Sequence, residues 1–181
     1  GLSTGPPTIC ACASRPVPPH RVHSPCSPRR HPPTRPEGTV TKTFTFASPE
    51  GKRFAFEAGQ YFLFDLEVGG EPESRCYSIS SSPRRSNAFS VTVKRVAGGK
   101  ISNWLHDTLT VGSKVKANGP LGHFIRPNAK KYLFLSGGSG ITPVMAMVRE
   151  LADTCEPADV VFLHAGRSPK DLIFRDDLAC L

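Results

Sequence analysis

The chain has 181 residues, of which 38% are hydrophobic and 21% are charged, a composition that can support a folded core. Its net charge is +8, but residues 1–36 hold five Arg and no Asp or Glu. The other eighteen basic residues are set against fifteen acids, so there is no concentrated basic face of the kind that nucleic-acid binding needs. The longest apolar runs have strand length, so we also expect no membrane span.

The first 37 residues are predicted to be a disordered Pro/Arg-rich tail. Residues 1–36 contain ten prolines, which remove backbone donors and disfavour helices and interior strands. Two readings stay open, an unstructured extension and an organelle import segment. Zinc binding is not favoured, because no folded scaffold is expected around the tail's ligand-type residues, which are Cys10, Cys12, His20, His23 and Cys26.

The six cysteines have no CxxC pair and no spacing typical of a plant-type iron–sulfur loop. Without a secretory segment, reduced thiols and a cytoplasmic location are the expectation. We therefore expect no metal site in this chain.

Residues 38–127 are predicted to form an antiparallel β-barrel with one short helix. Short segments rich in Phe, Tyr and Val alternate with Gly and Pro turns, as in barrels and sandwiches. The expected strands are Val40–Phe46, Arg53–Glu57, Gln60–Val68, Arg75–Ser80, Phe89–Val96 and Lys114–Asn118, with a helix at Ile101–Leu109.

Residues 128–181 are predicted to form an incomplete α/β domain. An apolar strand at Lys131–Ser136 is followed by a glycine-rich turn, a helix at Thr142–Ala152 and a second strand at Asp159–His164. Asp171–Leu181 is expected to begin another helix. This is the βαβ order of a nucleotide-binding domain, but such a domain needs more strands, and apolar faces are expected to stay uncovered.

Three segments have patterns typical of phosphate or cofactor binding. In Ser136–Pro143, glycines allow close backbone approach to a pyrophosphate, with Thr142 expected as the N-cap and Pro143 at the first helical position. In Arg75–Ser81, strand alternation places Arg75, Tyr77 and Ile79 on one face. In Gly98–Leu105, glycines lead into a helix N-terminus that accepts anions. Taken singly, each is also compatible with an ordinary turn, edge strand or capped helix.

Together and in this order, the segments resemble the ferredoxin–NADP reductase superfamily, in particular the reductase components of oxygenases. The resemblance also includes Ala58–Tyr61 before the central strands and Gly119–Phe124 at the junction of the two domains. It covers about residues 38–181. The family's cysteine–glycine region near the nicotinamide and its fused [2Fe–2S] domain have no counterpart in this sequence.

The resemblance implies FAD, favoured over FMN, as the resident cofactor, and NAD(P)H as the electron donor. Tyr77 would pack against the flavin ring and Ser78 would lie near the N5 atom that accepts hydride, which makes these two the catalytic residues. The implied flavin contacts are Arg75, Cys76, Tyr77, Ser78, Gly99, Lys100, Ile101 and Ser102. The implied nicotinamide-nucleotide contacts are Gly138, Gly140, Thr142, Pro143, His164, Ala165 and Arg167.

The implied activity is hydride transfer from NAD(P)H to FAD, followed by electron transfer to an iron–sulfur partner or an oxygenase component. Any [2Fe–2S] centre would belong to a partner or to a domain outside this sequence. Arg167 and Ser168 weakly favour NADPH, whereas the resembled oxygenase reductases often use NADH, so the donor stays open. The alternative is a flavin-binding module that is inactive by itself because the nucleotide domain is incomplete.

Overall fold

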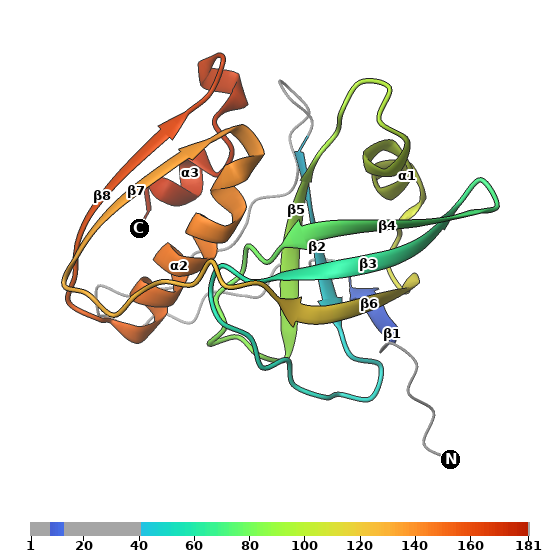
Figure 1. Cartoon of the computed structure of the whole chain (residues 1–181), viewed down its shortest axis with the longest axis horizontal. Coiled ribbons are helices and arrows are strands. Elements are labelled where there is room, and N and C mark those ends of the chain that lie inside the picture. Colours follow the sequence, from blue (N-terminus) through green and yellow to red (C-terminus); the bar gives the residue numbers. More distant parts are fainter. Residues whose placement is uncertain (1–7, 13–40, 181) are drawn as a thin grey trace.

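The computed structural model describes residues 8–12 and 41–180, which form two lobes joined side by side (Figure 1). The first lobe is a six-stranded sheet with one helix, and the second is a two-stranded sheet packed on a long helix. Within the described residues, no helix is long and apolar enough to cross a membrane. The predicted order of barrel and α/β unit is confirmed.

The barrel sheet is antiparallel throughout, in the order β4-β3-β6-β1-β2-β5. An isolated bridge between Ile79 and Val91 connects the chain after β4 to β5 and brings the two edges of the sheet together. The strands are β1 (Thr8–Cys12), β2 (Thr41–Ala47), β3 (Tyr61–Val68), β4 (Glu71–Ser78), β5 (Ala88–Lys94) and β6 (Lys114–Leu121).

Strand β1 corrects one expectation, because Thr8–Cys12 lies inside the segment predicted to have no strand. It pairs with β2 on one side and β6 on the other, so it is an interior strand of the barrel. The physical reason is local: this five-residue stretch has no proline and begins with the β-branched pair Thr8 and Ile9. The other residues of the tail, with the cysteines and histidines considered for zinc, lie outside the residues whose side chains are described.

Alternating aromatic residues build the barrel core. Along β3 the side chains of Phe62, Phe64 and Leu66 are buried, while the residues between and beside them are half-buried or exposed. Phe89 of β5 stacks on Phe62 with ring centroids 4.3 Å apart. Because full burial of one such side chain contributes roughly 1.5–3 kcal/mol, this cluster is the main source of stability for the lobe.

Helix α1 (Lys100–Thr108) packs its apolar stripe onto the same core through Ile101 and Leu105. His106 on this helix is also buried, and its Nε2 lies 2.9 Å from the carbonyl oxygen of Val93. The helix therefore covers the barrel and turns its N-terminus towards β4, where Lys100 forms an ion pair with Glu73.

The hairpin between β3 and β4 shows where strand prediction fell short. Gly69 and Gly70 both have positive φ, at 65° and 83°, as a two-residue type I′ turn requires. This turn pairs Val68 with Glu71, so β4 begins four residues before the predicted start at Arg75. The expected strand at Arg53–Glu57 is wrong: that segment is irregular and pairs with no strand among the described residues, although the Phe54 N–H donates to the Ser86 carbonyl at 2.7 Å and the Glu57 N–H donates to Gln60 Oε1 at 2.9 Å.

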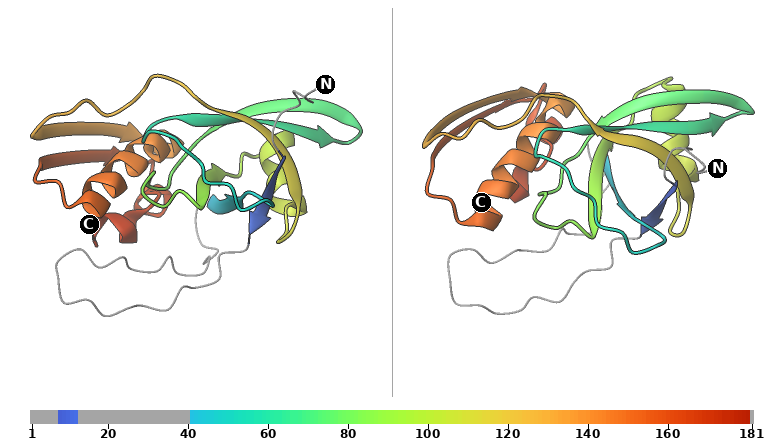
Figure 2. Two further views of the ribbon diagram at one scale, coloured as in Figure 1. Left: turned by 90° about the horizontal axis from the view of Figure 1, so that it is seen from below. Right: turned by 60° about the horizontal axis from the view of Figure 1, so that its bottom comes forward.

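In the second lobe, β7 (Lys131–Gly137) pairs in parallel with β8 (Asp159–Ala165), and α2 (Ile141–Thr154) crosses between them. Short helices η1 (Gly138–Gly140), η2 (Pro169–Asp171) and α3 (Arg175–Leu178) complete the lobe. Helix α2 lies along one face of the sheet, as Figure 2 shows. The opposite face stays exposed, as predicted, and its residues Leu133, Leu135, Val161 and Leu163 are each more than half exposed.

Candidate functional site

The flavin motif predicted at Arg75–Ser78 occupies the last four positions of β4. The register places Tyr77 opposite Phe62 and Arg75 opposite Phe64, which confirms that these two side chains share one face. The Tyr77 ring packs edge-on against Phe64, with centroids 5.6 Å apart. Burial raises the pKa of Tyr77, so this side chain is a neutral ring held by the core, suited to packing against a flat cofactor. Ser78, the other proposed catalytic residue, is half-buried on the opposite face.

The loop before α1 has the close packing expected of a phosphate cradle. A Cβ on Gly99 would lie 2.7 Å from Ser102 Oγ and 3.0 Å from Val96 Cβ, so a larger residue there would force the Ser102 side chain or the loop to shift. Ser102 Oγ accepts a hydrogen bond from the Val96 N–H at 3.1 Å, which leaves its own O–H free to donate to a phosphate oxygen. Helix α1 has no side-chain cap at its N-terminus, so its first backbone N–H groups are available to an anion.

Two cationic side chains border this cradle from different elements. Arg75 comes from β4 and is 55% exposed, and Lys100 is the first residue of α1 and is 50% exposed. Glu73 lies between them, 3.0 Å from Lys100 Nζ and 3.6 Å from Arg75 Nη1. The residues present therefore fit a flavin diphosphate, since they combine a glycine approach, an open helix end and two cations.

The glycine turn after β7 forms the second predicted site. Gly138–Gly140 forms a single turn of 3-10 helix that runs directly into α2, and Gly138 has a φ of +50°. One detail of the expectation is wrong: the helix begins at Ile141, so Thr142 is not its N-cap and Pro143 is not its first residue. Instead, Thr142 is buried and its hydroxyl donates to the Ser139 carbonyl at 3.1 Å, which holds the turn closed. Pro143 still lies in the first turn of the helix, where backbone N–H groups have no acceptor within the helix, so its missing N–H costs no hydrogen bond.

A pocket of about 430 Å³ opens at the carboxyl ends of β7 and β8. Its walls include Gly137, Gly138 and Ser139 of the turn, and Ala165 and Arg167 after β8. Nucleotides bind at this position in open α/β sheets. The pocket also has one wall from the barrel, Lys94 at the end of β5. No sequence pattern indicates Lys94 as a site residue, because it is one of several Lys and Arg at strand ends.

His164 is placed differently from the other residues expected around the adenosine half. Its Nδ1 lies 2.8 Å from Ser136 Oγ, and its Nε2 is buried without a hydrogen-bond partner among the described residues. Burial lowers its pKa, with the contact to Ser136 acting in the opposite direction. The lining of the pocket includes Ala165 and Arg167 but not His164, so its contact with a dinucleotide stays a prediction.

The joint between the lobes depends on an extremely close backbone approach. A Cβ on Gly59 would lie 1.8 Å from the Phe124 carbonyl oxygen and 2.6 Å from Met147 Cε of α2. The preceding residue, Ala58, belongs to the apolar cluster of the second lobe together with Val144 and Met147. The Ala58–Tyr61 segment, which the sequence analysis named only as part of the family resemblance, is thus where the barrel packs onto α2.

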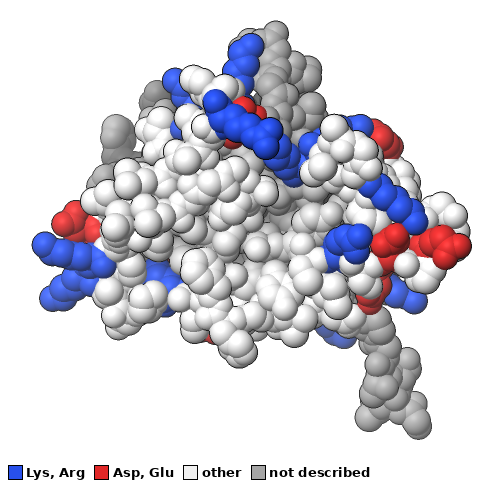
Figure 3. Space-filling view, turned by 45° about the horizontal axis from the view of Figure 1, so that its top comes forward, with Lys and Arg blue, Asp and Glu red and all other residues white. Residues whose placement is uncertain are grey.

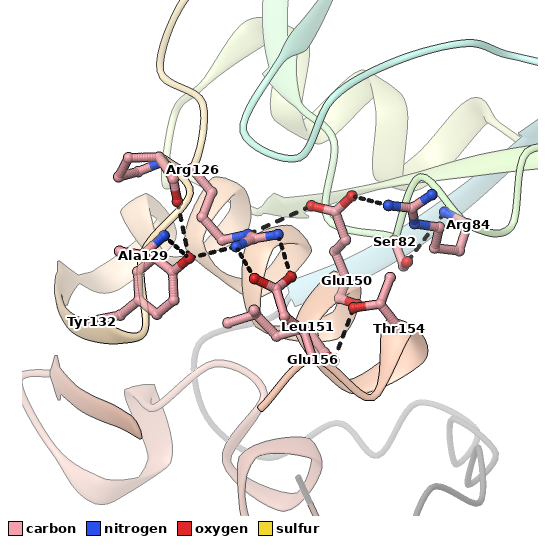
Figure 4. A network of polar contacts seen from close by, with 10 residues as sticks. Ser82, Arg84, Arg126, Ala129, Tyr132, Glu150, Leu151, Thr154 and Glu156 are labelled. Carbon is pink, nitrogen blue, oxygen red and sulfur yellow. Dashed lines mark hydrogen bonds and ion pairs between the residues drawn. The ribbon is translucent and has the colours of Figure 1, made fainter. Parts of the chain in front are cut away.

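Charged side chains fasten the same joint (Figure 4). Glu150 of α2 lies 3.5 Å from Arg84 of the barrel loop and 3.7 Å from Arg126 of the connecting segment. Arg126 also donates to both carboxylate oxygens of Glu156, at 3.2 and 2.9 Å, and to Tyr132 Oη at 2.5 Å. These contacts fix the direction in which the chain leaves the barrel.

Helix α2 is also tied to the strand extension that follows the flavin motif. Arg149 donates to the carbonyl oxygen of Ser80 at 2.6 Å, lies over the Phe174 ring at 4.8 Å, and is only 12% exposed. Arg85 and Asp153 add a bidentate pair at 3.1 and 2.9 Å. The helix that begins at the glycine turn is therefore anchored two residues beyond Ser78.

The face seen in Figure 3 has a broad uncharged middle, with mainly Lys and Arg side chains along its upper edge and both basic and acidic side chains at the left and right. An uncharged surface with a basic upper edge suits a cofactor that combines an apolar ring system with phosphates. Two candidate cofactor sites, one on the barrel and one at the glycine turn, are the arrangement expected of the class of flavin-dependent oxidoreductases that bind a nicotinamide dinucleotide.

Comparison with known families agrees with this class and refines it. Residues 37–125 match the oxidoreductase FAD-binding domain, and residues 134–181 match the oxidoreductase NAD-binding domain. The chain belongs to the ferredoxin–NADP reductase superfamily, as its sequence motifs indicated.

Similar proteins include reductase components of oxygenases. A glycine betaine monooxygenase reductase subunit of Pseudomonas aeruginosa is 50% identical over 139 residues, which are 76% of this chain and 38% of that protein. Phthalate dioxygenase reductase, a modular protein for electron transfer from pyridine nucleotides to [2Fe–2S], is 27% identical with a TM-score of 0.68 over 79% of this chain and 44% of its own. A ferredoxin–NADP+ reductase of Neisseria gonorrhoeae with bound FAD and NADP is 27% identical, with a TM-score of 0.65 over 78% of this chain and 57% of its own.

Proposed function

We propose that the protein acts as an NAD(P)H-dependent flavin reductase that passes electrons to an iron–sulfur partner or an oxygenase component. The observation that carries the proposal is the position of Lys94, because this barrel residue lines the pocket at the glycine turn of the second lobe. One pocket is thus built from both cofactor-binding lobes, as hydride transfer between two cofactors requires. The chain spans 38% of the length of the monooxygenase reductase subunit that it resembles, and that protein's name indicates the kind of partner.

The proposed residue roles follow from the positions described above. Arg75, Lys100 and the Gly99–Ser102 helix end hold the flavin diphosphate, and Tyr77 supports the ring. The turn at Gly137–Ser139 together with Lys94 receives the dinucleotide phosphates. Ile101 is buried in the barrel core and so fixes the start of α1 at this site. Cys76 would contact the flavin through its backbone, on the edge strand β4.

Bound FAD supplies the hydride-accepting and electron-releasing chemistry. The contribution of the chain is positioning and exclusion of water. In this proposal the Ser78 hydroxyl would donate a hydrogen bond to the reacting ring nitrogen, and Tyr77, which packs on Phe64, would limit the tilt of the ring. This role requires no general base.

The donor specificity rests on the end of the pocket beyond β8. Arg167 suits a 2′-phosphate, whereas the Asp171 carboxylate suits a ribose hydroxyl, and both line the pocket. Ser168 Oγ donates to Asp171 Oδ2 at 2.9 Å, so the carboxylate is already held in place by a neutral group. The reduction of the flavin by NADH and by NADPH therefore has to be compared directly.

A reducing compartment fits the cysteine chemistry of the described part of the chain. Cys76 and Cys180 are exposed thiols outside any disulfide among the described residues, a state that a reducing compartment maintains. We propose a cytoplasmic location on this basis.

The test is an anaerobic titration of the FAD-loaded protein with NADH and, separately, NADPH, followed by flavin absorbance. Bleaching at one equivalent of either donor per flavin supports the reductase. Stable flavin absorbance with both donors would support the alternative, a flavin-binding module without dinucleotide oxidation.

A further inference from the structure

Glu73 occupies an unusual place for an acid, because it lies inside the basic part of the flavin diphosphate site. Its Oε1 is 3.0 Å from Lys100 Nζ and its Oε2 is 3.6 Å from Arg75 Nη1. The Glu73 side chain is 22% exposed, less than half as exposed as either cation. One carboxylate therefore bridges a strand and a helix that are far apart in sequence.

The backbone explains how Glu73 reaches both cations. Glu73 and Arg75 are two residues apart on β4 and point to the same face. Lys100 approaches from the first position of α1, whose uncapped N-terminus faces the same space. The Lys100 ammonium, as the largest influence, together with Arg75 holds the pKa of Glu73 below its usual range.

A diphosphate at this site competes with the carboxylate for the same donors. Arg75 Nη1 already donates to the Ser74 carbonyl at 2.7 Å and faces Glu73, so part of its donor fork is occupied. A phosphate group in contact with Arg75 and Lys100 would bring further negative charge next to Glu73, and like charges repel. When the cofactor binds, either Glu73 loses its ion pair with at least one of the two cations, or the diphosphate binds in spite of repulsion by the Glu73 carboxylate.

We propose that Glu73 is a built-in counter-ion of the flavin diphosphate site, which pairs Arg75 and Lys100 in the empty site and lowers the affinity for phosphate-bearing flavins. Glu73 keeps two neighbouring cations from repelling each other before the cofactor arrives. Once the cofactor binds, the negative charge of Glu73 repels the negative charge of the diphosphate. This inference rests on the proposed function, because it takes the flavin diphosphate as the ligand of Arg75 and Lys100.

The test is the dissociation constant of FAD for the full chain and its Glu73→Gln variant, measured by quenching of flavin fluorescence. We expect the variant to bind FAD about fivefold more tightly, an effect typical of a partly exposed ion pair. Glu71→Gln is the matched control, since Glu71 lies two residues earlier on the same strand and its replacement changes the net charge equally. Glu71→Gln should leave the FAD affinity within twofold of the original.

Riboflavin, which has no phosphate, separates the counter-ion role from a general change in the site. Its affinity should be the same in the original chain and in Glu73→Gln. Unchanged or weaker FAD binding by the variant, or an equal gain for riboflavin, would overturn the counter-ion role. A wild-type chain that takes up no FAD would instead contradict the proposed function.

A second measurement on the unaltered chain does not depend on the variant's folding. The pKa of the Glu73 carboxyl, followed by NMR, should rise when FAD binds, because the carboxylate then loses cation contacts and gains an anionic neighbour. A pKa that stays the same or falls on FAD binding would also overturn the proposal.

Discussion

Arg75 is the side chain on which flavin retention should depend most strongly. It is the charged residue of the motif on β4, and a guanidinium can form a bidentate contact with a phosphate. Because hydrogen bonds to charged groups contribute about 1.5–3 kcal/mol, we expect Arg75→Ala to weaken FAD binding by about 10- to 100-fold. Equilibrium dialysis against FAD measures this change. Arg53→Ala, at an exposed Arg lining a different pocket, is the control, and equal FAD content in the two variants would contradict the role of Arg75.

Two histidines, the buried His106 and the half-buried His164, should make the stability of the fold sensitive to mild acid. Burial lowers the pKa of both His106 and His164, so the unfolded chain binds protons more readily than the folded one. Their contribution is then fully present above the unfolded pKa of about 6.5 and is lost as the pH falls towards the folded value. We expect a lower free energy of unfolding in urea at pH 5.5 than at pH 7.5. His106→Gln, which keeps a donor for the Val93 carbonyl, should reduce that difference, and a pH-independent wild type would rule the effect out.

Local side-chain chemistry was readable from the sequence only in part. Alternation along Arg75–Ser80 correctly placed Arg75 and Tyr77 on one face. It could not show that Glu73 lies on that face as well, because the start of β4 depends on the Gly69–Gly70 turn and its register. Likewise, nothing near Lys94 in the sequence indicated a pocket whose other residues lie more than forty positions further along the chain.

At the scale of elements, the contact of the barrel turn with α2 is the tightest feature of the joint. Gly59→Ala would place a Cβ 1.8 Å from the Phe124 carbonyl oxygen. Overpacking of this kind typically costs about 1–3 kcal/mol, added to the strain of a positive φ. Gly51→Ala is a matched control, since Gly51 also has a positive φ of 68° but open space around it.

Chemical denaturation of both glycine variants gives the comparison. We expect Gly59→Ala to lose at least about 1 kcal/mol more free energy of unfolding than Gly51→Ala. Equal losses would mean that the close approach of barrel and helix at Gly59 is not a feature of the folded protein.

Most elements could be predicted from periodicity, and the failures have identifiable causes. Phe-rich alternation indicated β3 and β5, and the apolar stripe indicated α1, each to within a few residues. The segment Arg53–Glu57 looks like a strand because of Phe54 and Phe56, yet it pairs with no strand in the part of the chain that the structure describes. Strand β1 was missed because proline density was judged over the whole of residues 1–36 and not over its proline-free Thr8–Cys12 stretch.

For the whole molecule, Arg149 should couple the two lobes. It connects α2 to the Ser80 carbonyl and pairs with Asp177 at 3.5 Å, and it is nearly buried. Removal of one member of a buried ion pair typically costs about 3–5 kcal/mol. In Arg149→Met we therefore expect calorimetry to show two separate unfolding transitions in place of one, whereas Arg149→Lys should retain more of the coupling. A single transition at the original midpoint in Arg149→Met would contradict this.

The overall architecture followed from the sequence because several motifs occurred in a fixed order, each next to the element it needs. The joint between the lobes did not follow, because it rests on contacts such as Gly59 with Met147 and Arg85 with Asp153, which no local pattern encodes. The exposed sheet face with Leu133 and Leu163 was expected from the short βαβ unit and is present.

The most direct test of the central claim, a flavin site on this chain, is titration of the folded apoprotein with FAD. We expect saturation at one FAD per chain, with quenched flavin fluorescence, and loss of that binding in Gly99→Ala, whose Cβ would meet Ser102 Oγ at 2.7 Å. A folded wild-type chain that leaves flavin fluorescence unchanged at every concentration, or a Gly99→Ala variant that binds FAD as tightly as the wild type, would contradict the claim.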